Sequence, residues 1–279
     1  MGHGKLRKFA ENETFGCLLQ PDAASVLAKP EGAKELILRD HAIKGNWNRD
    51  MFAKDQPIVV ELGCGKGDYT IALARRHPEM NFIGVDIKGA RLWKGAKEAT
   101  EDALGNVAFL RTRIEFITAF FAPGEISEIW LTFSDPQMKS ENSRLSSPLF
   151  LERYRSFMKP GGVVHLKTDS RFLHEYTKAV CKANGLAVRA CTQDLYSSLM
   201  PLCGQATVPS DFIDKLDPVV YEVQTFYEKM FLEMGLPITY LQFCIDHEGP
   251  YVHPEDFDEK YWREAEGPRR SFSHSPQKK

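Results

Sequence analysis

The sequence lacks the features that mark membrane, secreted and zinc-binding proteins. It contains no run of 18 apolar residues, so we expect no membrane span, and its N-terminus has no apolar signal segment. The six cysteines form no C-x-x-C pair and no zinc-like spacing with histidine, which predicts a reduced cytoplasmic protein without a metal site. Excess positive charge is also absent, because the formal net charge is −2. Any contact with nucleic acid must therefore come from a local basic patch.

What the chain does contain is a glycine-rich turn between a predicted strand and a predicted helix. Residues 57–62 are mostly apolar and rich in β-branched side chains, as in a strand that is buried on both faces. Glu61 lies near the end of this strand, and Gly63, Gly65 and Gly67 follow at alternate positions. Glycine at these positions allows positive φ angles or lets a ligand lie against bare backbone. Backbone N–H groups at the start of the next helix would face that ligand.

A second predicted strand, 82–86, ends in Asp86, whose carboxylate can accept hydrogen bonds from two ribose hydroxyls. These elements follow one another in a fixed order: a strand, the E-x-G-x-G-x-G turn, a helix, a second strand and an acid. This order favours a site for a nucleoside-type cofactor over a turn with only a structural role. The glycine spacing differs from the dinucleotide pattern G-x-G-x-x-G, and no G-K-[ST] motif follows for a triphosphate. S-adenosylmethionine has no phosphate, so its binding needs fit this turn best.

Strands and helices alternate through most of the chain. Strands are predicted at 57–62, 82–86, 107–111, 128–133, 163–168, 186–192 and 238–245. Helices are predicted at 67–76, 88–104, 115–121, 148–158, 170–183 and 219–234, and a loop at 193–217. This repeat predicts an α/β fold with a mostly parallel sheet that helices cover.

The chain divides by composition into three parts. We predict an N-terminal arm and extension over 1–54, of which the first 20 or so residues form a mobile basic arm. A single large domain over 55–247 would follow. Residues 248–279 shift to an acidic and then a basic, proline-containing composition, which predicts a disordered C-terminal tail.

Four acids stand at or near the ends of predicted strands: Glu61, Asp86, Asp135 and Asp169. Because ligands of open parallel sheets bind at the carboxyl ends of the strands, we expect these acids along one edge. Each alone could be a helix cap or a turn former, but the four together favour a functional site. Pro136 follows Asp135 and disfavours a helical backbone there, so the chain turns abruptly after that strand.

Several motifs resemble the bacterial tRNA (guanine-N7)-methyltransferases of the TrmB type over about residues 45–245. The segment ELGCGKGDY (61–69) and the PGG turn (160–162) are shared by methyltransferases in general. More specific to that family are FSDP (133–136), LKTD (166–169) and TFYE (225–228). The resemblance implies a Rossmann-like class I fold with a seven-stranded sheet and helices on both faces. It also implies S-adenosylmethionine as cofactor and methyl transfer to N7 of a guanosine in tRNA, in the variable loop.

The resemblance assigns roles position by position. It implies that Glu61 lies nearest the methionine end of the cofactor, that Asp86 binds the ribose, and that Asp135 is the catalytic aspartate beside both cofactor and guanine. The implied cofactor-binding residues are Glu61, Gly63, Gly65, Asp86, Arg113 and Asp135. The implied substrate-binding residues are Lys139, Asp169, Thr225 and Glu228.

Two positions depart from the family pattern. The dense basic cluster that the family carries after D-P is reduced here to Lys139 and Arg144, and Arg113 stands where an aspartate near adenine is common. Fewer cations predict fewer phosphate contacts and a shallower salt dependence of RNA binding. Residues that could replace the lost charge are Lys5, Arg7, Lys8, Arg269 and Arg270.

Two other functions stay open at this point. One is a methyltransferase of the same fold that acts on a small molecule or a protein, which the reduced basic cluster favours. The other is a non-catalytic RNA-binding relative, which the intact glycine turn and strand-end acids disfavour. We further expect the protein to be a monomer or a weak homodimer.

Overall fold

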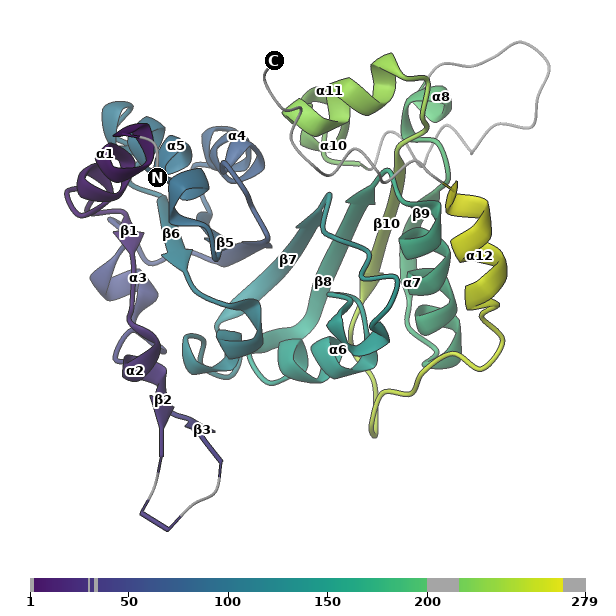
Figure 1. The fold of residues 1–279 in the computed structure, drawn as a ribbon, viewed down its shortest axis with the longest axis horizontal. Helices are drawn as coiled ribbons and strands as arrows, with labels where there is room; N and C mark the ends of the chain where they lie inside the picture. The colour runs from purple at the N-terminus through teal and green to yellow at the C-terminus, as the bar shows by residue number, and fades with distance from the viewer. Residues whose placement is uncertain (1–2, 30, 33–34, 200–215, 268–279) are drawn as a thin grey trace.

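The central element of the chain is an eight-stranded sheet in the order β1-β6-β5-β4-β7-β8-β10-β9 (Figure 1). The computed structural model describes residues 3–29, 31–32, 35–199 and 216–267. The strands are β1 (Leu18–Leu19), β4 (Ile58–Leu62), β5 (Asn81–Asp86), β6 (Val107–Arg111), β7 (Ile126–Thr132), β8 (Met158–Thr168), β9 (Val188–Thr192) and β10 (Thr239–Cys244). Among the described strands of this sheet, every pair is parallel except the two that β10 forms with β8 and β9, so the predicted α/β fold with a mostly parallel sheet is confirmed.

The sheet has one strand more than predicted. Leu18 pairs with Phe109 and Leu19 with Leu110, which adds β1 in parallel at the edge beside β6. A separate two-stranded hairpin joins β2 (Leu27–Ala28) and β3 (Ile37–Leu38). These very short strands carry too little periodic pattern to be predicted from the sequence.

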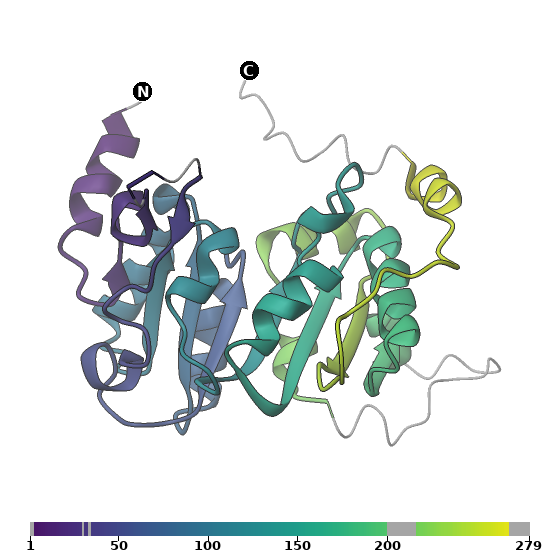
Figure 2. The ribbon, with the colours of Figure 1, turned by 90° about the horizontal axis from the view of Figure 1, so that it is seen from below.

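Helices cover both faces of the sheet, as Figure 2 shows. Alternate residues of β4 explain why. Val60 and Leu62 enter one core together with α6 (Pro148–Arg155) and α7 (Arg171–Ala183). Val59 enters the opposite core with α4 (Asp68–Arg76) and α5 (Gly89–Glu101). A strand that is buried on both faces must be apolar at nearly every position, which is the pattern that predicted it.

Several other helices are short. They are α2 (Ala23–Val26), α3 (Trp47–Asp50), η1 (Ile114–Ala119), η2 (Glu141–Ser143), α8 (Leu195–Leu199), α10 (Val219–Glu222) and α11 (Phe226–Glu233). The predicted single helix 219–234 is wrong, because Thr225 caps a new helix after α10: its hydroxyl accepts a hydrogen bond from the backbone N–H of Glu228 at 3.2 Å. The loop predicted from residue 193 includes α8, and 200–215 lie outside the described residues. No helix in the described part of the chain is long and apolar enough to cross a membrane.

The N-terminal residues form a docked helix, so the predicted mobile arm is wrong from residue 3 onward. Helix α1 (His3–Asn12) packs against α5. The side chain of Asn12 donates a hydrogen bond to the carbonyl of Gly89 at 2.9 Å, and the indole N–H of Trp93 donates to Glu11 at 2.6 Å. The sequence of α1 is polar enough to look unstructured, and its partners lie about 80 positions away.

The predicted disordered tail is also wrong as far as residue 267. Tyr251 is buried, and helix α12 (Glu259–Glu266) packs against α7. A carboxylate oxygen of Glu266 accepts a hydrogen bond from the backbone N–H of Phe172 at 3.0 Å, where it caps the start of α7. The acidic composition therefore serves contacts with the domain. Residues 268–279, including Arg269 and Arg270, lie outside the described residues.

Candidate active site

The glycine turn after β4 has the backbone that its sequence predicts. Gly63, Gly65 and Gly67 have φ angles of 79°, 58° and 77°. A Cβ atom added at Gly67 would lie 2.7 Å from the ring of Phe109, so this glycine is required by packing as well as by its φ angle. A Cβ added at Gly63 or Gly65 would meet nothing within 4 Å. These two glycines therefore leave bare backbone facing open space, as a bound ligand requires.

Asp86 at the end of β5 is tied to that turn. One carboxylate oxygen accepts a hydrogen bond from the backbone N–H of Gly65 at 3.1 Å, and the other accepts one from Lys88 N–H at 2.7 Å. A carboxylate offers about four acceptor positions, so about two remain for further donors. This matches the need of a ribose with two neighbouring hydroxyls. The turn and the strand-end acid thus form one unit, as the sequence predicted.

Glu61 is buried beneath the turn and is held by two threonines. One of its oxygens accepts hydrogen bonds from the backbone N–H of Thr70 at 2.9 Å and from the Thr70 hydroxyl at 2.5 Å. Its other oxygen accepts one from the hydroxyl of Thr132. Burial raises the pKa of Glu61 to about 7, although the hydrogen bonds from Thr132 and Thr70 oppose the shift. Three of about four acceptor positions are filled, so roughly one is left for a cationic group.

A cavity of about 110 Å³ opens beside this turn. It is lined by Glu61, Gly63, Cys64, Gly65, Lys66, Asp68, Tyr69, Arg91, Thr132, Phe133, Thr225, Phe226 and Tyr227. These residues come from the ends of β4 and β7, from α4 and α5, and from the start of α11. Segments that lie up to 166 positions apart in the sequence, from Glu61 to Tyr227, therefore meet at one small cavity, which we call the turn cavity.

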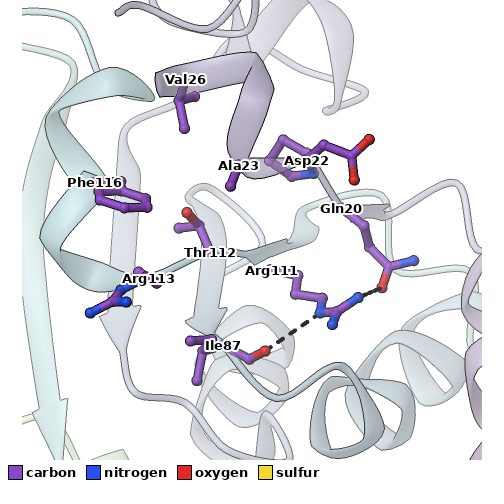
Figure 3. A pocket seen from close by; sticks show the side chains of 10 residues that line it. Gln20, Asp22, Ala23, Val26, Ile87, Arg111, Thr112, Arg113 and Phe116 are labelled. Atoms are coloured by element: carbon purple, nitrogen blue, oxygen red, sulfur yellow. Dashed lines mark hydrogen bonds between the residues drawn. The ribbon is translucent and has the colours of Figure 1, made fainter. Parts of the chain in front are cut away.

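A larger cavity of about 270 Å³ lies at the ends of β5 and β6 (Figure 3). We call it the strand-end cavity. It is lined by Gln20, Pro21, Asp22, Ala23, Val26, Ile87, Arg111, Thr112, Arg113 and Phe116. The guanidinium of Arg111 donates hydrogen bonds to the carbonyl of Ile87 at 3.4 Å and to the side-chain oxygen of Gln20 at 3.5 Å. These two bonds, dashed in Figure 3, tie the N-terminal extension to the sheet. The extension was not predicted to form part of a site.

Arg113 lines the strand-end cavity, and its place near adenine stays a prediction. Its guanidinium lies 3.4 Å from Glu115 and 5.6 Å from the ring centre of Phe116. Thr112, one residue earlier, is largely buried and also faces this cavity. The aspartate that is common in the family at this place has no counterpart here among the residues after β6, and Asp22 of the extension is the acid in the lining.

The backbone around Asp135 is strained. Phe133 and Gln137 have φ angles of 51° and 46°, values that cost non-glycine residues about 1–3 kcal/mol each and that cluster at functional sites. Asp135 itself is exposed, and its side chain accepts a hydrogen bond from the backbone N–H of Gln137 at 2.9 Å. Phe133 and Gly63 line the same cavity. Asp135 therefore lies at the same edge as the glycine turn, as the sequence predicted.

Thr225 and Glu228 differ in how the structure uses them. Thr225 lines the turn cavity, whereas the side chain of Glu228 is fully buried. A carboxylate oxygen of Glu228 lies 2.5 Å from the ammonium group of Lys167 and accepts a hydrogen bond from the Tyr196 hydroxyl at 2.6 Å. Lys167 also donates to the hydroxyl of Tyr69 at 2.6 Å. In this structure Glu228 holds the start of α11 in place and has no surface for a substrate.

Burial lowers the pKa of Lys167 to about 8, although the neighbouring Glu228 raises it. Lys167 lies near the carboxyl end of β8, within the LKTD segment, so the sequence offered a signal: a lysine inside a strand that is otherwise buried. Such a lysine needs a partner, because an unpaired charge is costly to bury. The identity of that partner could not be predicted from the sequence.

The loop after Asp135 presents less positive charge than its sequence suggests. Arg144 is fully buried, with its guanidinium 4.8 Å from the ring centre of Phe172 and 4.3 Å from that of Tyr176. It forms an ion pair with Glu259 of α12. Lys139 is exposed, so this loop offers one accessible cation. Asp169 is half-buried after β8, the strand next to β7, which places it near the same edge.

Two exposed aromatic rings stand at the turn cavity. Phe226 and Tyr227 are 62% and 43% exposed, and their ring centres are 5.6 Å apart in an edge-to-face arrangement. The ammonium group of Lys66 lies 5.2 Å from the ring centre of Phe226. Exposed rings beside a polar cavity can stack on a nucleic-acid base.

The sheet order, the glycine turn with its two acids and the flanking cavities define a class I S-adenosylmethionine-dependent methyltransferase. Residues 55–207 match a family model described as "Putative methyltransferase". The chain is 46% identical to a tRNA (guanine-N(7)-)-methyltransferase of Bacteroides thetaiotaomicron, over 91% of each chain. It is 45% identical to one of Christiangramia forsetii, over 86% of this chain and 97% of that one. The chain belongs to the TrmB-type tRNA (guanine-N7)-methyltransferase family.

Among solved structures, the chain is similar to the 16S rRNA methyltransferase KamB. That similarity has a TM-score of 0.47 and 15% sequence identity, and it covers 76% of this chain and 97% of the other. In the described part of the chain, no group of three or more His, Cys, Asp or Glu side chains is arranged to hold a metal ion.

Proposed function

We propose that this protein transfers a methyl group from S-adenosylmethionine to N7 of a guanosine in tRNA, in the variable loop. The observation that carries the proposal is the lining of the turn cavity, where the glycine turn meets Phe133 of FSDP and Thr225 to Tyr227 of TFYE. A cofactor turn alone would suit many substrates. The relatives named above carry the same activity in their names. We also propose that the protein acts in the cytoplasm as a monomer or a weak homodimer.

The residues around the two cavities fit S-adenosylmethionine. Asp86 has acceptor positions left for the ribose hydroxyls, and Glu61 has one for the ammonium group of the methionine end. Gly63 and Gly65 provide bare backbone between them. The strand-end cavity with Arg113 would take the adenine. When bound, the cofactor supplies an electrophilic methyl group on a positively charged sulfur.

Guanine N7 has an accessible lone pair and carries no proton, so this chain needs no general base at the nucleophile. Its task is to place N7 about 3 Å from the methyl carbon and to keep water out. The Asp135 carboxylate would accept hydrogen bonds from the guanine N1–H and exocyclic amine, which fixes the ring and offsets the positive charge that methylation creates. Asp169, after the neighbouring strand, is the other candidate for this role.

The exposed rings of Phe226 and Tyr227 would stack on the guanine after it leaves its own stack. Extruding a base costs a free energy of a few kcal/mol, and stacking of that base on an aromatic side chain offsets about 1–3 kcal/mol of this cost. Lys139 and Thr225 would contact the nucleotide around the base. A single accessible cation in the loop after Asp135 favours one alternative, a methyltransferase of small molecules or proteins.

Incubation of the purified protein with labelled S-adenosylmethionine and total tRNA tests the proposal. We expect label in tRNA that becomes cleavable at one guanosine after mild reduction and aniline treatment. Label confined to small molecules or protein would support the alternative, and RNA binding without label would support a non-catalytic role. Asp135→Ala should lower turnover far more than cofactor affinity, and equal losses in both would remove the assignment of Asp135. Sedimentation at micromolar concentrations tests the oligomeric state.

A further inference from the structure

One surface of this acidic protein carries a local excess of positive charge. We call it the α1–α5 surface: it comprises the charged residues of helix α1, of the glycine turn and of residues 88–94. Its basic residues are Lys5, Arg7, Lys8, Lys66, Lys88, Arg91 and Lys94, and its acidic residues are Glu11 and Asp68. The whole chain has a formal net charge of −2. The rest of the protein is therefore more negative than the whole.

Direct contacts make this surface continuous. The ammonium group of Lys8 on α1 lies 4.4 Å from the ring centre of Trp93 on α5. A Cβ atom added at Gly95 of α5 would lie 2.8 Å from the carbonyl oxygen of Lys66 in the glycine turn. Lys94 lies 2.6 Å from Asp68 at the start of α4. Helix α1 packs against α5, and Figure 1 shows the two helices side by side.

The surface reaches the active site. Lys66 and Arg91 line the turn cavity, and Lys88 follows β5 two residues after Asp86. From there the surface extends along α1, a helix of 10 residues and about 15 Å. A nucleotide in the turn cavity would therefore have its neighbouring phosphates next to these cations.

Most of these cations are available to a ligand. Arg7 and Lys94 are paired with Glu11 and Asp68 at 3.3 Å and 2.6 Å. Lys5, Lys66, Lys88 and Arg91 are exposed and have no carboxylate partner within the part of the chain that the structure describes. The loop after Asp135 contrasts with this, because Arg144 there is buried and only Lys139 is accessible.

We propose that the α1–α5 surface binds the phosphate backbone of the tRNA and so replaces the basic loop that this chain lacks. This inference rests on the proposed function, because it takes tRNA as the substrate. Lysine and arginine side chains that neutralise phosphates release condensed counterions, which gives affinity without sequence preference. Sequence selection would stay with the turn cavity, and the surface would set affinity and orientation.

The test is a triple variant, Lys5→Gln/Lys8→Gln/Lys88→Gln, which removes three cations that do not line either cavity. We expect its dissociation constant for tRNA at 0.1 M salt to rise at least tenfold. The slope of log affinity against log salt concentration should become shallower by about 2, since each lost phosphate contact contributes about 0.7–0.9. Cofactor affinity, from calorimetry, and the circular dichroism spectrum should match the wild type.

The matched control is Lys54→Gln/Lys159→Gln/Lys182→Gln. It removes three exposed lysines near the opposite edge, where β4 and β8 begin and α7 ends. It changes net charge equally, so its affinity for tRNA should stay within about twofold of the wild type if position matters.

The outcomes separate this inference from the proposed function. A triple variant that binds tRNA with wild-type affinity and salt slope would overturn the inference. If that variant also methylates tRNA, the proposed function stands. An equal loss in the control would also overturn it, because bulk charge would explain the effect. A wild-type protein that binds tRNA through this surface without methylating it would contradict the proposed function alone. Binding of the wild type to phosphatidylserine vesicles but not to tRNA would overturn both.

Discussion

The ion pair of Lys167 and Glu228 provides a quantitative test of how α11 is held at the active site. Both side chains are fully buried, and the charged atoms are 2.5 Å apart. Glu228→Gln keeps the shape of the side chain and the capping box with Thr225, because glutamine also serves at that position. It removes the charge, however, and leaves the ammonium group of Lys167 without a counter-ion.

Removing one partner of a buried ion pair costs about 3–5 kcal/mol. That is a large share of the roughly 5–15 kcal/mol that keeps a domain folded. For a chain of this size each kcal/mol lowers the melting temperature by about 2–4 °C, so we expect a fall of about 6–20 °C for Glu228→Gln. Calorimetric or circular dichroism melts at pH 7 measure this directly.

The lowered pKa of Lys167 predicts how the stability loss of Glu228→Gln changes with pH. The folded protein holds the pKa of Lys167 at about 8, below its ordinary value of 10.5. Between these values the unfolded chain binds a proton that the folded chain has released, so the Lys167 contribution to stability rises with pH in this window. Without Glu228 the pKa falls further and the window extends below pH 8. The deficit of Glu228→Gln should therefore be largest near pH 6 and shrink toward pH 9.

The double variant Lys167→Met/Glu228→Gln serves as the control. It removes both charges, and exchange of a buried pair for neutral side chains is often neutral or stabilising. We expect it to melt well above Glu228→Gln and to lose the extra pH dependence. A Glu228→Gln protein that melts within about 2 °C of the wild type at pH 6 would refute the reasoning, and so would a double variant no more stable than the single one.

Three further predictions concern the cavities. Asp86→Ala should weaken S-adenosylmethionine binding by roughly 10- to 100-fold in calorimetry, since it removes charge-assisted hydrogen bonds worth about 1.5–3 kcal/mol; an unchanged affinity would exclude Asp86 from the ribose site. Cofactor affinity should rise from about pH 5 to about pH 7 and then level off, because burial raises the pKa of Glu61 to about 7 and a cationic ligand favours its carboxylate form. Glu61→Gln should flatten this profile, and a variant with the wild-type profile would exclude Glu61 as its origin. Phe226→Ala should raise the KM for tRNA about tenfold in initial-rate assays with little change in cofactor affinity, since base stacking is worth about 1–3 kcal/mol; a selective loss of cofactor binding would place the ring elsewhere.

The parts of this protein that were predictable from the sequence depend on local signals. The strand at 58–62, its glycine turn and Asp86 each follow from residues within about 25 positions, and the structure has them in contact. The site edge was predictable because parallel strands bring their carboxyl ends together. Thr70 and Thr132, which hold Glu61, carry no signal of their own, because threonine is common both in helices and in strands.

Several of the errors share one physical cause, which is pairing over long sequence distances. Helix α1 is polar, and only its contacts with α5 show that it is docked. Arg144 is 115 positions from Glu259, and neither residue alone distinguishes a buried ion pair from two solvated charges. Composition predicted a disordered acidic tail for the same reason, since burial of its charges depends on partners in other elements.

Long-range ion pairing also decides which cations of this protein can contact its RNA substrate. Arg144 and Lys167 stand in segments where the sequence suggests contact with RNA, yet both are fully buried and paired with acids of helices α12 and α11. A buried, paired cation contributes almost nothing to the field that a phosphate backbone meets outside. Affinity for RNA therefore depends on exposed, unpaired cations, and four of these, Lys5, Lys66, Lys88 and Arg91, lie on the α1–α5 surface, where Lys66 and Arg91 line the turn cavity. A net charge of −2 is thus compatible with a polyanionic substrate, because position and exposure decide which charges that substrate meets.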